Sequence, residues 1–465
     1  MKILITLGNY IKNHISHTIV IIVLIALFAY FINPFDGATF SQKRTETKNT
    51  ISLFYQLLTE DETRPIESNE LPDLGDLELQ TLAGSITLFR DVRAGNWEFI
   101  GADRHVMAET MKRVINHPGN KDKQFIDTFP GEDTGPGTWV YEWSETAQEY
   151  YNLAFKAEEK GDFNIARKSY YLAAIYFDIA KFPHLGYPEE EKAHSQATNS
   201  YEKAGRYFEV PLEKIVIPFE GGDIVGYLHL PERSVHEKVP AVIWSGGLDY
   251  FKEWLYPNVQ ELNRQGIAAI TMDTAGLSDN DEWLLTPGNA SKIVTQMINK
   301  VSRHPRIDPD RIGVAGTSFG GNIAVRLAIT DTRIKAAVNH GGPIHRMWAV
   351  HPRIMGIIKE MVRHTYSDRT GADVKDVFDM TMKGKAFDLV AAGLVGQNRY
   401  TTDTPILSVN GGKDLFAPVS DMALVTDASS SGEYWVMGVN EGHCTHAYEP
   451  VMIPQIAAWF ASKLN

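Results

Sequence analysis

Residues 311–325 read RIGVAGTSFGGNIAV, and this stretch decides the fold. A short apolar run of strand type, Ile312–Ala315, meets Gly-Thr-Ser-Phe-Gly and passes directly into an apolar-periodic helix. A nucleophile elbow needs this strand–turn–helix context, because a serine in a sharp, strained turn projects its hydroxyl above the sheet. Gly316 and Gly320 flank Ser318 because a side chain at either position would collide with the neighbouring strand or helix. The stretch therefore predicts that Ser318 is a nucleophile.

The composition is that of a large, acidic, globular protein. A chain of 465 residues is too long for one ordinary domain, so we expect two or three units. Hydrophobic residues make up 43% and aromatic residues 11%, which is typical of a substantial core. The formal net charge of −13 argues against a nucleic-acid partner, because phosphate binding needs a basic face. The single cysteine, Cys444, excludes an internal disulfide and any zinc site built from cysteines.

Residues 1–40 stand apart because they hold an unbroken apolar run. Residues 19–32 are all apolar or aromatic, and Lys2 and Lys12 precede them. The positive-inside rule then leaves the N-terminus in the cytoplasm and the rest of the chain outside. We predict an uncleaved signal anchor in residues 1–40 that enters the membrane through residues 17–33, with an extracytoplasmic (periplasmic) catalytic domain. The alternative is an amphiphilic helix that packs on a cytoplasmic protein.

Residues 41–210 are predicted to form a helical N-terminal domain. Small and aromatic residues recur at helical spacing between Trp139 and Leu185, and Gly161-Asp162 breaks this pattern in two. The two halves resemble one tetratricopeptide-type hairpin, but no second copy follows at the same period, so we do not expect a solenoid. The aromatic stripe that begins with Trp139 and Trp143 is more typical of a core than of a ligand-binding surface.

From residue 211 onward the pattern changes to strands that alternate with helices. The expected strands are Ile215–Phe219, Ile224–Leu230, Val239–Ser245, Ile267–Asp273, Ile312–Ala315, Ala336–Asn339, Pro405–Asn410 and Tyr434–Val439. The expected helices are Trp254–Gln265, Ser291–Ser302, the helix after Ser318, and Tyr448–Leu464. Such alternation gives a mostly parallel sheet with helices on both faces. Residues 211–465 are therefore predicted to be an α/β catalytic domain, with a Met-rich cap insertion at about 345–400.

A serine is a weak nucleophile until a base takes its proton and an acid orients that base. In the α/β-hydrolase order, the acid and then the histidine follow the serine, each after the end of a strand. Asp414 and His443 each follow one of the last two predicted strands. We therefore predict the catalytic triad Ser318, Asp414 and His443. The second choices are His446 as base and Asp421 as acid.

Stabilising the charge that develops on the substrate oxygen needs two backbone N–H groups, which form an oxyanion hole. One is predicted to be the N–H of Phe319, at the start of the helix after Ser318, where N–H groups are free to bind an anion. The second should come from the loop after the third strand. Gly246-Gly247-Leu248-Asp249 occupies that place, and we expect the Gly247 or the Leu248 amide to be the donor.

Three polar side chains near these positions need a role. An unpaired carboxylate beside a forming oxyanion is repulsive, so we expect Asp249 to hold its loop in place through Lys252. Glu253 either lines the pocket or begins a solvated helix. His340 either faces the pocket or satisfies the loop that follows its strand.

No metal or cofactor is predicted. The histidines are scattered and lack the spacing of paired metal ligands. Gly221-Gly222 and Gly411-Gly412 are turn glycines, and neither forms a dinucleotide or phosphate fingerprint.

Several short motifs, in this order along the chain, resemble one known family. They are Trp139-Val140-Tyr141-Glu142-Trp143, Ala180-Lys181-Phe182-Pro183-His184-Leu185, Gly226-Tyr227-Leu228-His229-Leu230-Pro231, Gly246-Gly247-Leu248-Asp249 and Asn322-Ile323-Ala324-Val325-Arg326-Leu327-Ala328. Over about residues 135–460 the chain is similar to the fermentation–respiration switch protein (FrsA) esterases. The resemblance implies an α/β-hydrolase with a helical N-terminal domain and activity on short-chain carboxylic esters. Members of that family are cytoplasmic and lack an obvious anchor, so residues 1–35 depart from its pattern.

The sequence therefore leaves three possible functions to be distinguished. The first is a serine hydrolase that cleaves a small-molecule carboxylic ester through an acyl-enzyme on Ser318. The second, implied by the resemblance, is carbon–carbon bond hydrolysis of β-diketone-type substrates by the same triad. The third is a non-catalytic hydrolase scaffold whose helical domain binds a regulatory protein partner.

Overall fold

The computed structural model describes residues 87–88, 90–117, 125–127, 134–397 and 399–465. The predicted anchor in residues 1–40 and the first part of the predicted helical domain, residues 41–86, lie outside the described residues. Over the part that is described, no helix is both long enough and apolar enough to cross a membrane.

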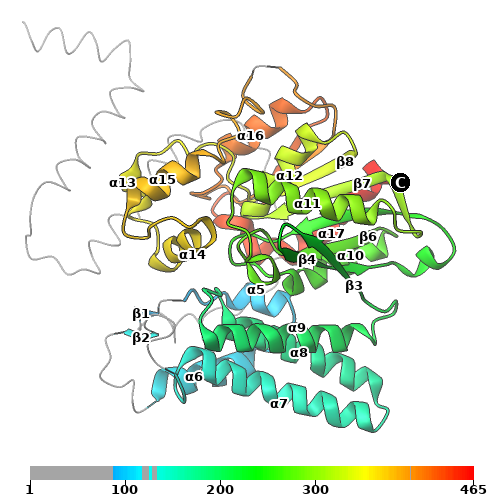
Figure 1. Ribbon diagram of the computed structural model, residues 1–465, viewed down its shortest axis with the longest axis vertical. Helices are drawn as coiled ribbons and strands as arrows, with labels where there is room; N and C mark the ends of the chain where they lie inside the picture. Colours follow the sequence, from blue (N-terminus) through cyan, green and yellow to red (C-terminus); the bar gives the residue numbers. More distant parts are fainter. Residues whose placement is uncertain (1–86, 89, 118–124, 128–133, 398) are drawn as a thin grey trace, which may run out of the picture. The chain divides into compact units, whose positions relative to one another are not determined.

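An eight-stranded sheet organises the C-terminal half of the chain (Figure 1). Its strands are β3 (Glu213–Phe219), β4 (Gly222–His229), β5 (Val239–Ser245), β6 (Ala268–Met272), β7 (Ile307–Thr317), β8 (Ile334–His340), β9 (Ile406–Asn410) and β10 (Glu433–Val436). They lie in the order β10-β9-β8-β7-β5-β6-β4-β3. Strand β4 runs antiparallel to both β3 and β6, and the other neighbouring pairs are parallel. This arrangement is the α/β-hydrolase fold, and it confirms the predicted mostly parallel sheet.

Helices cover both faces of the sheet because successive residues of a strand point to opposite sides. In the fully buried strand β5, Val242 and Trp244 pack with one set of helices, while Ala241 and Ile243 pack with the other. The first set includes α10 (Tyr256–Arg264) and α17 (Glu449–Leu464), and the second includes α11 (Pro287–Val301) and α12 (Phe319–Thr330). In Figure 1 the ribbons of α11 and α12 run over the same side of the strands. Burial on both faces explains why β5 reads as a continuous apolar run.

Two element boundaries differ from the predicted ones for local reasons. Helix α11 begins before the predicted Ser291, because the Thr286 hydroxyl accepts a hydrogen bond from the Asn289 N–H and caps the helix there. Strand β10 ends at Val436, before the predicted end, because the chain turns at Gly438, whose φ is 77°.

Helices dominate the described residues before the sheet. They are α5 (Ala94–Phe99), α6 (Arg104–Asn116), α7 (Trp139–Glu159), α8 (Phe163–Lys181) and α9 (Pro188–Gly205), with a short parallel pair of strands, β1 (Thr87–Leu88) and β2 (Phe125–Asp127). Helices α7 and α8 form the hairpin that the sequence predicts, and they turn at Gly161, whose φ is 78°. Helix α9 packs on α8.

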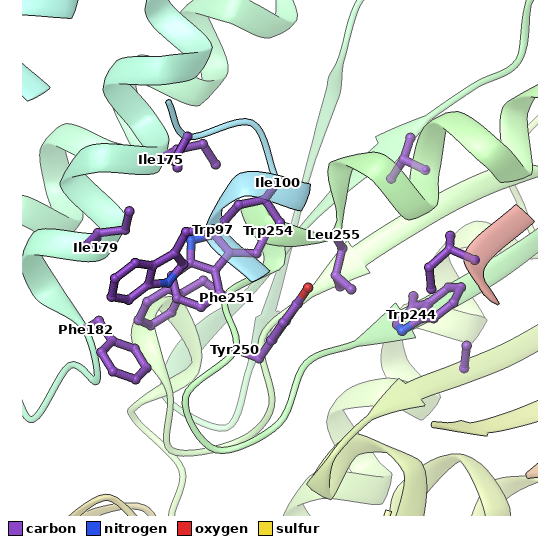
Figure 2. Packing of buried hydrophobic residues seen from close by; sticks show 14 of the residues in the cluster. Trp97, Ile100, Ile175, Ile179, Phe182, Trp244, Tyr250, Phe251, Trp254 and Leu255 are labelled. Atoms are coloured by element: carbon purple, nitrogen blue, oxygen red, sulfur yellow. The ribbon is translucent and has the colours of Figure 1, made fainter. Parts of the chain in front are cut away.

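One hydrophobic cluster joins these helices to the sheet (Figure 2). Trp97 of α5 is fully buried, and its ring centroid lies 6.1 Å from that of Phe182, just after α8. Phe182 in turn stacks at 5.9 Å on Trp254, which lies in the short helix η3 (Lys252–Leu255) after β5. Figure 2 shows these aromatic side chains together with Tyr250 and Phe251 of the segment that precedes η3. The helices therefore share a core with the segment that follows β5.

Three helices are inserted between β8 and β9, namely α13 (Pro352–Met355), α14 (Glu360–Thr370) and α15 (Val377–Lys385), and α16 (Val419–Ala428) follows β9. The insertion packs on the start of α12. The Phe319 ring centroid lies 6.0 Å from that of Trp348 and 4.7 Å from that of Phe387. The inserted helices fall within residues 345–400, for which a cap is predicted, and the role of a cap stays a prediction.

Candidate active site

Ser318 lies in the sharp turn between β7 and α12. Its φ of 54° and ψ of −128° belong to a region that residues other than glycine seldom adopt, so the turn is strained. A Cβ atom at Gly316 would lie 2.0 Å from the Gly320 backbone, and one at Gly320 would lie 2.5 Å from the Gly246 carbonyl oxygen. Both positions therefore require glycine, and the turn has the geometry of a nucleophile elbow.

The structure brings Ser318, His443 and Asp414 together in one chain of hydrogen bonds. Ser318 Oγ lies 2.8 Å from His443 Nε2, and His443 Nδ1 lies 2.6 Å from Asp414 Oδ2. The three residues follow the parallel strands β7, β9 and β10, whose carboxyl ends meet at the same edge of the sheet. Because Nδ1 donates to the carboxylate, Nε2 is left to accept the proton of the serine hydroxyl.

The Asp414 carboxylate is buried and accepts hydrogen bonds at both oxygens. Besides His443, Asn410 Nδ2 donates to Oδ2 at 2.6 Å and the Phe416 N–H donates to Oδ1 at 2.7 Å. Burial by itself raises the pKa of the Asp414 carboxyl, but the charge on His443 and these hydrogen bonds together lower it below its ordinary value. Sequence reasoning missed Asn410, although its place at the end of the strand before Asp414 is a signal that could have found it.

The charge on Asp414 also acts on the His443 imidazole. Burial lowers the pKa of the His443 imidazole, but the Asp414 charge and hydrogen bond contribute to a net shift well above its ordinary value. The Asp414 carboxylate therefore favours the charged, imidazolium form of His443.

The loop that carries His443 has a strained backbone. Cys444 and Thr445 have φ angles of 58° and 43°, which are uncommon for residues with side chains. The Cys444 N–H donates to Asn410 Oδ1 at 3.0 Å, and His340 Nε2 donates to the Cys444 carbonyl oxygen at 2.7 Å. Burial lowers the pKa of His340 to about 4, so the imidazole is neutral. The sequence offers two roles for His340, and the structure shows a contact with a loop carbonyl, although that carbonyl belongs to the loop that carries His443 and not to the loop after the strand of His340.

The segment Gly246–Phe251, here called the β5 loop, lies against Ser318. A Cβ atom at Gly247 would lie 2.7 Å from Ser318 Cβ and 3.0 Å from Ser318 Oγ, so the close approach depends on glycine. The N–H of Phe319 belongs to the first residue of α12, and such a group has no carbonyl partner within its own helix. Of the residues whose backbone groups are predicted to bind an oxyanion, Phe319 and Gly247 therefore lie next to Ser318, and Leu248 follows Gly247 in the chain.

Two predictions about residues that follow the double glycine are wrong. Asp249 does not pair with Lys252, because its carboxylate accepts two hydrogen bonds from Arg93, at 3.2 and 2.6 Å. Lys252 is buried and contacts the carboxylates of Glu253 and Asp273, each at 2.9 Å. Glu253 is 0% exposed, so it neither begins a solvated helix nor lines a pocket. The helices before the sheet pack over η3 and bury Lys252 and Glu253. The sequence around η3 gives no sign of this burial.

The second choices for base and acid take other partners. His446 Nδ1 lies 3.0 Å from Glu449 Oε1. The Asp421 carboxylate accepts hydrogen bonds from the backbone N–H groups of residues 344–346, and burial raises its pKa to about 6. Neither side chain joins the chain of hydrogen bonds that starts at Ser318.

Among the residues that the structure describes, no group of three or more His, Cys, Asp or Glu side chains could hold a metal ion. Cys444 is a buried free thiol whose Sγ lies 3.6 Å from the His340 carbonyl oxygen. The structure places a serine hydroxyl, an imidazole, a buried carboxylate and backbone N–H groups together at the elbow.

Comparison with known sequences points to one family. The sequence model of the FrsA-like family, described as “Esterase FrsA-like”, matches residues 53–465. Esterase FrsA of Vibrio cholerae serotype O1 (strain M66-2) is 29% identical over 350 residues, which cover 74% of this chain and 81% of that relative. Esterase FrsA of Vibrio vulnificus (strain YJ016) is 27% identical over 349 residues and has the same coverage.

Comparison with solved structures supports the fold. The 2,6-dihydroxy-pseudo-oxynicotine hydrolase has a TM-score of 0.65 at 20% identity, over 80% of this chain and 95% of that one. A structure of AbyA5 has a TM-score of 0.56 at 19% identity, over 72% of this chain and 95% of that one. At these identities the likeness concerns the fold alone.

Proposed function

This chain belongs to the FrsA-like esterase family and is an esterase-type hydrolase, and from this premise we propose that it cleaves carboxylic esters through an acyl-enzyme on Ser318. The observation that carries the proposal is the chain of hydrogen bonds from Ser318 Oγ through His443 to Asp414, with distances of 2.8 and 2.6 Å. The strained elbow that presents the serine hydroxyl supports the same assignment.

In the first half of the reaction, Ser318 Oγ attacks the ester carbonyl carbon while His443 Nε2 takes the hydroxyl proton. The Asp414 carboxylate stabilises the imidazolium that forms, because it is buried and held by its own donors as an anion. The tetrahedral intermediate then collapses. The carbon–oxygen bond to the alcohol breaks, and the alcohol leaves with the proton from His443, so the acyl group stays on Ser318.

In the second half, water repeats these steps in place of the serine. His443 Nε2 takes a proton from the water as its oxygen attacks the acyl carbon, and the same proton returns to Ser318 Oγ when the acyl–serine bond breaks. The products are a carboxylic acid and the free enzyme. Apart from the ester and this water, every group that takes part in either half belongs to the chain.

The developing oxyanion is the main charge that the site must stabilise. We assign its donors to the N–H of Phe319 and to the N–H of Gly247 or Leu248 in the β5 loop. The support is the position of Phe319 at the start of α12 and the close approach of Gly247 to Ser318. Removing one such donor typically costs about 100- to 1,000-fold in kcat, so the position of the β5 loop should matter for rate.

The purified full-length chain should hydrolyse p-nitrophenyl acetate or butyrate, and Ser318→Ala should abolish that activity. Ser302→Ala is a matched control, because the Ser302 hydroxyl only donates to the Ile298 carbonyl on α11. Equal turnover by Ser318→Ala and the wild type would refute the assignment of the nucleophile. Absence of turnover in the wild type with every ester tested would refute the proposed reaction.

A further inference from the structure

Two arginines from distant parts of the sequence hold adjacent residues of the β5 loop. Arg93 immediately precedes α5, and Arg369 lies in α14 of the insertion. Arg93 binds the Asp249 carboxylate, and Arg369 binds the Leu248 carbonyl oxygen. We propose that Arg93 and Arg369 are positioning residues that keep the β5 loop in place for oxyanion binding. The inference rests on the proposed esterase function and adds two residues to the requirements of its site.

The Arg93 contact is a two-pronged ion pair. Its Nη1 and Nη2 atoms lie 3.2 and 2.6 Å from the two carboxylate oxygens of Asp249. The Arg93 side chain is 19% exposed and the Asp249 side chain 14% exposed, so solvent screens this pair less than a surface pair. The Arg93 guanidinium carbon also lies 4.6 Å from the Phe182 ring centroid. Planar, two-pronged pairing fixes direction as well as distance, so Arg93 restrains where Asp249 can lie.

The Arg369 contact joins three segments at one side chain. Its Nε donates to the Leu248 carbonyl oxygen at 3.0 Å, and its Nη2 donates to the carbonyl oxygens of Pro183, at 2.8 Å, and His184. The side chain is 2% exposed, and its Nη1 pairs with Asp368. The guanidinium fork therefore ties the β5 loop to the chain after α8 and to the insertion.

The β5 loop needs such outside restraint because of its own composition. Gly246-Gly247 lets the backbone approach Ser318 but adds conformational freedom that must be removed. At the far end, Tyr250 and Phe251 are buried in the aromatic cluster and the N–H of Lys252 donates to Asp273 Oδ1 at 2.9 Å, which leaves Leu248 and Asp249, in the middle of the loop, to be held by other contacts. Arg93 and Arg369 act at that middle, on the two residues that follow Gly247. Since a misplacement of about 1 Å can cost about 100-fold in rate, loosening these contacts should affect catalysis.

The test compares Arg93→Met, Arg93→Lys and Arg369→Met in the full-length chain with the control Arg333→Met. Arg333 also forms a two-pronged pair, with Asp331, but at the opposite end of the sheet before β8. Two quantities are measured: amide hydrogen exchange of the peptide that covers the β5 loop, and kcat and KM for p-nitrophenyl butyrate. Exchange in the β5 loop should become about tenfold faster in both methionine variants of the loop arginines.

We expect kcat to fall by about 10- to 100-fold in these two variants, while KM changes by less than about threefold. Arg93→Lys keeps the charge but loses the fork and should lie between Arg93→Met and the wild type. Arg333→Met should match the wild type in both measurements.

Unchanged loop exchange in Arg93→Met, or faster exchange with unchanged kcat, would overturn the inference. Arg93→Met tests the inference even if Arg369→Met fails to fold. The Arg93 pair is partly exposed to solvent, so its loss leaves fewer buried polar groups unpaired than the loss of Arg369, whose side chain is 2% exposed. The exchange measurement is independent of turnover. If the wild type hydrolysed no ester, the proposed function would fail, whereas loop exchange would still report whether the arginines hold the loop.

Discussion

Replacing Asp414 by asparagine removes one charge with almost no change of shape, and the structure sets the size of the expected effect. When His443 takes the serine proton, it faces the Asp414 carboxylate with 2.6 Å between Nδ1 and Oδ2. The centres of the two charges then lie about 4 Å apart, and with an effective dielectric constant of about 20 their attraction is about 4 kcal/mol. Since about 1.4 kcal/mol corresponds to a tenfold change in rate, Asp414→Asn should lower kcat by about 1,000-fold.

The amide also conflicts with the donors around it. Oδ2 of Asp414 accepts from both His443 and Asn410, and Oδ1 accepts from the Phe416 N–H. An asparagine has one oxygen and one NH2 group, so in either orientation the NH2 group faces a donor. At least one buried donor is then left without an acceptor, and we expect a loss of about 1–3 kcal/mol in the free energy of unfolding.

The pH profile of kcat/KM gives a second readout of the same change. Burial lowers the pKa of His443, but Asp414 contributes to the net shift that places it well above its usual value of about 6.5. A base must be neutral to act, so the wild-type profile should rise with pH along an acid limb above about pH 6.5. The raised pKa also means that the charged pair stabilises the fold below about pH 6.5 and that this contribution is lost as pH rises through the folded pKa. Asp414→Asn should move the acid limb to lower pH.

Steady-state kinetics with p-nitrophenyl butyrate, combined with thermal unfolding, measures these effects. Asp421→Asn is the matched control, because Asp421 is equally buried and also accepts backbone hydrogen bonds, yet lies outside the triad. It should lose stability and keep kcat near the wild-type value. An Asp414→Asn variant with kcat within about tenfold of the wild type would refute the reasoning, because the charge would then stabilise the imidazolium by less than about 1.4 kcal/mol.

Three further substitutions test other parts of the site. Gly247→Ala places a Cβ atom 2.7 Å from Ser318 Cβ. The β5 loop or the elbow must then shift, so kcat/KM should fall by about 100-fold and stability should fall by about 1–3 kcal/mol; wild-type kinetics would contradict the close approach. His340→Leu removes the donor to the Cys444 carbonyl and should lower kcat by about tenfold with little change in KM. His340→Gln keeps a donor and should recover most of the lost kcat. Equal values of kcat in the two variants would contradict a positioning role for His340. Trp97→Ala empties a fully buried position in the cluster of Figure 2 and should cost about 3–5 kcal/mol in chemical denaturation, and a loss below about 1 kcal/mol would show that the cluster contributes little.

Much of the fold could be predicted because its signals are local. Strand β5 reads as an apolar run because both of its faces are covered, and Gly161 marks the turn between α7 and α8 because only a glycine adopts its backbone angles without strain. The placement of Ser318, Asp414 and His443 could likewise be predicted from the sequence. Each residue follows a predicted strand, and parallel strands bring their carboxyl ends to the same edge of the sheet.

The partners of charged side chains could not be predicted, because they depend on which segments meet in space. The sequence predicts that Asp249 pairs with nearby Lys252, because it contains no local sign that Arg93 reaches Asp249. Asn410 links the Asp414 carboxylate to the Cys444 amide, and such a link becomes visible only when the loops after β9 and β10 are adjacent. The anchor in residues 1–40 lies outside the described residues and stays a prediction.

The central claim is that His443 makes the Ser318 hydroxyl reactive, and labelling with a fluorophosphonate probe tests it most directly. Peptide mapping of the labelled full-length chain should place the adduct on Ser318, and His443→Gln should slow labelling by about 1,000-fold or more. Failure of the wild type to label, an adduct on another serine, or undiminished labelling of His443→Gln would contradict the account.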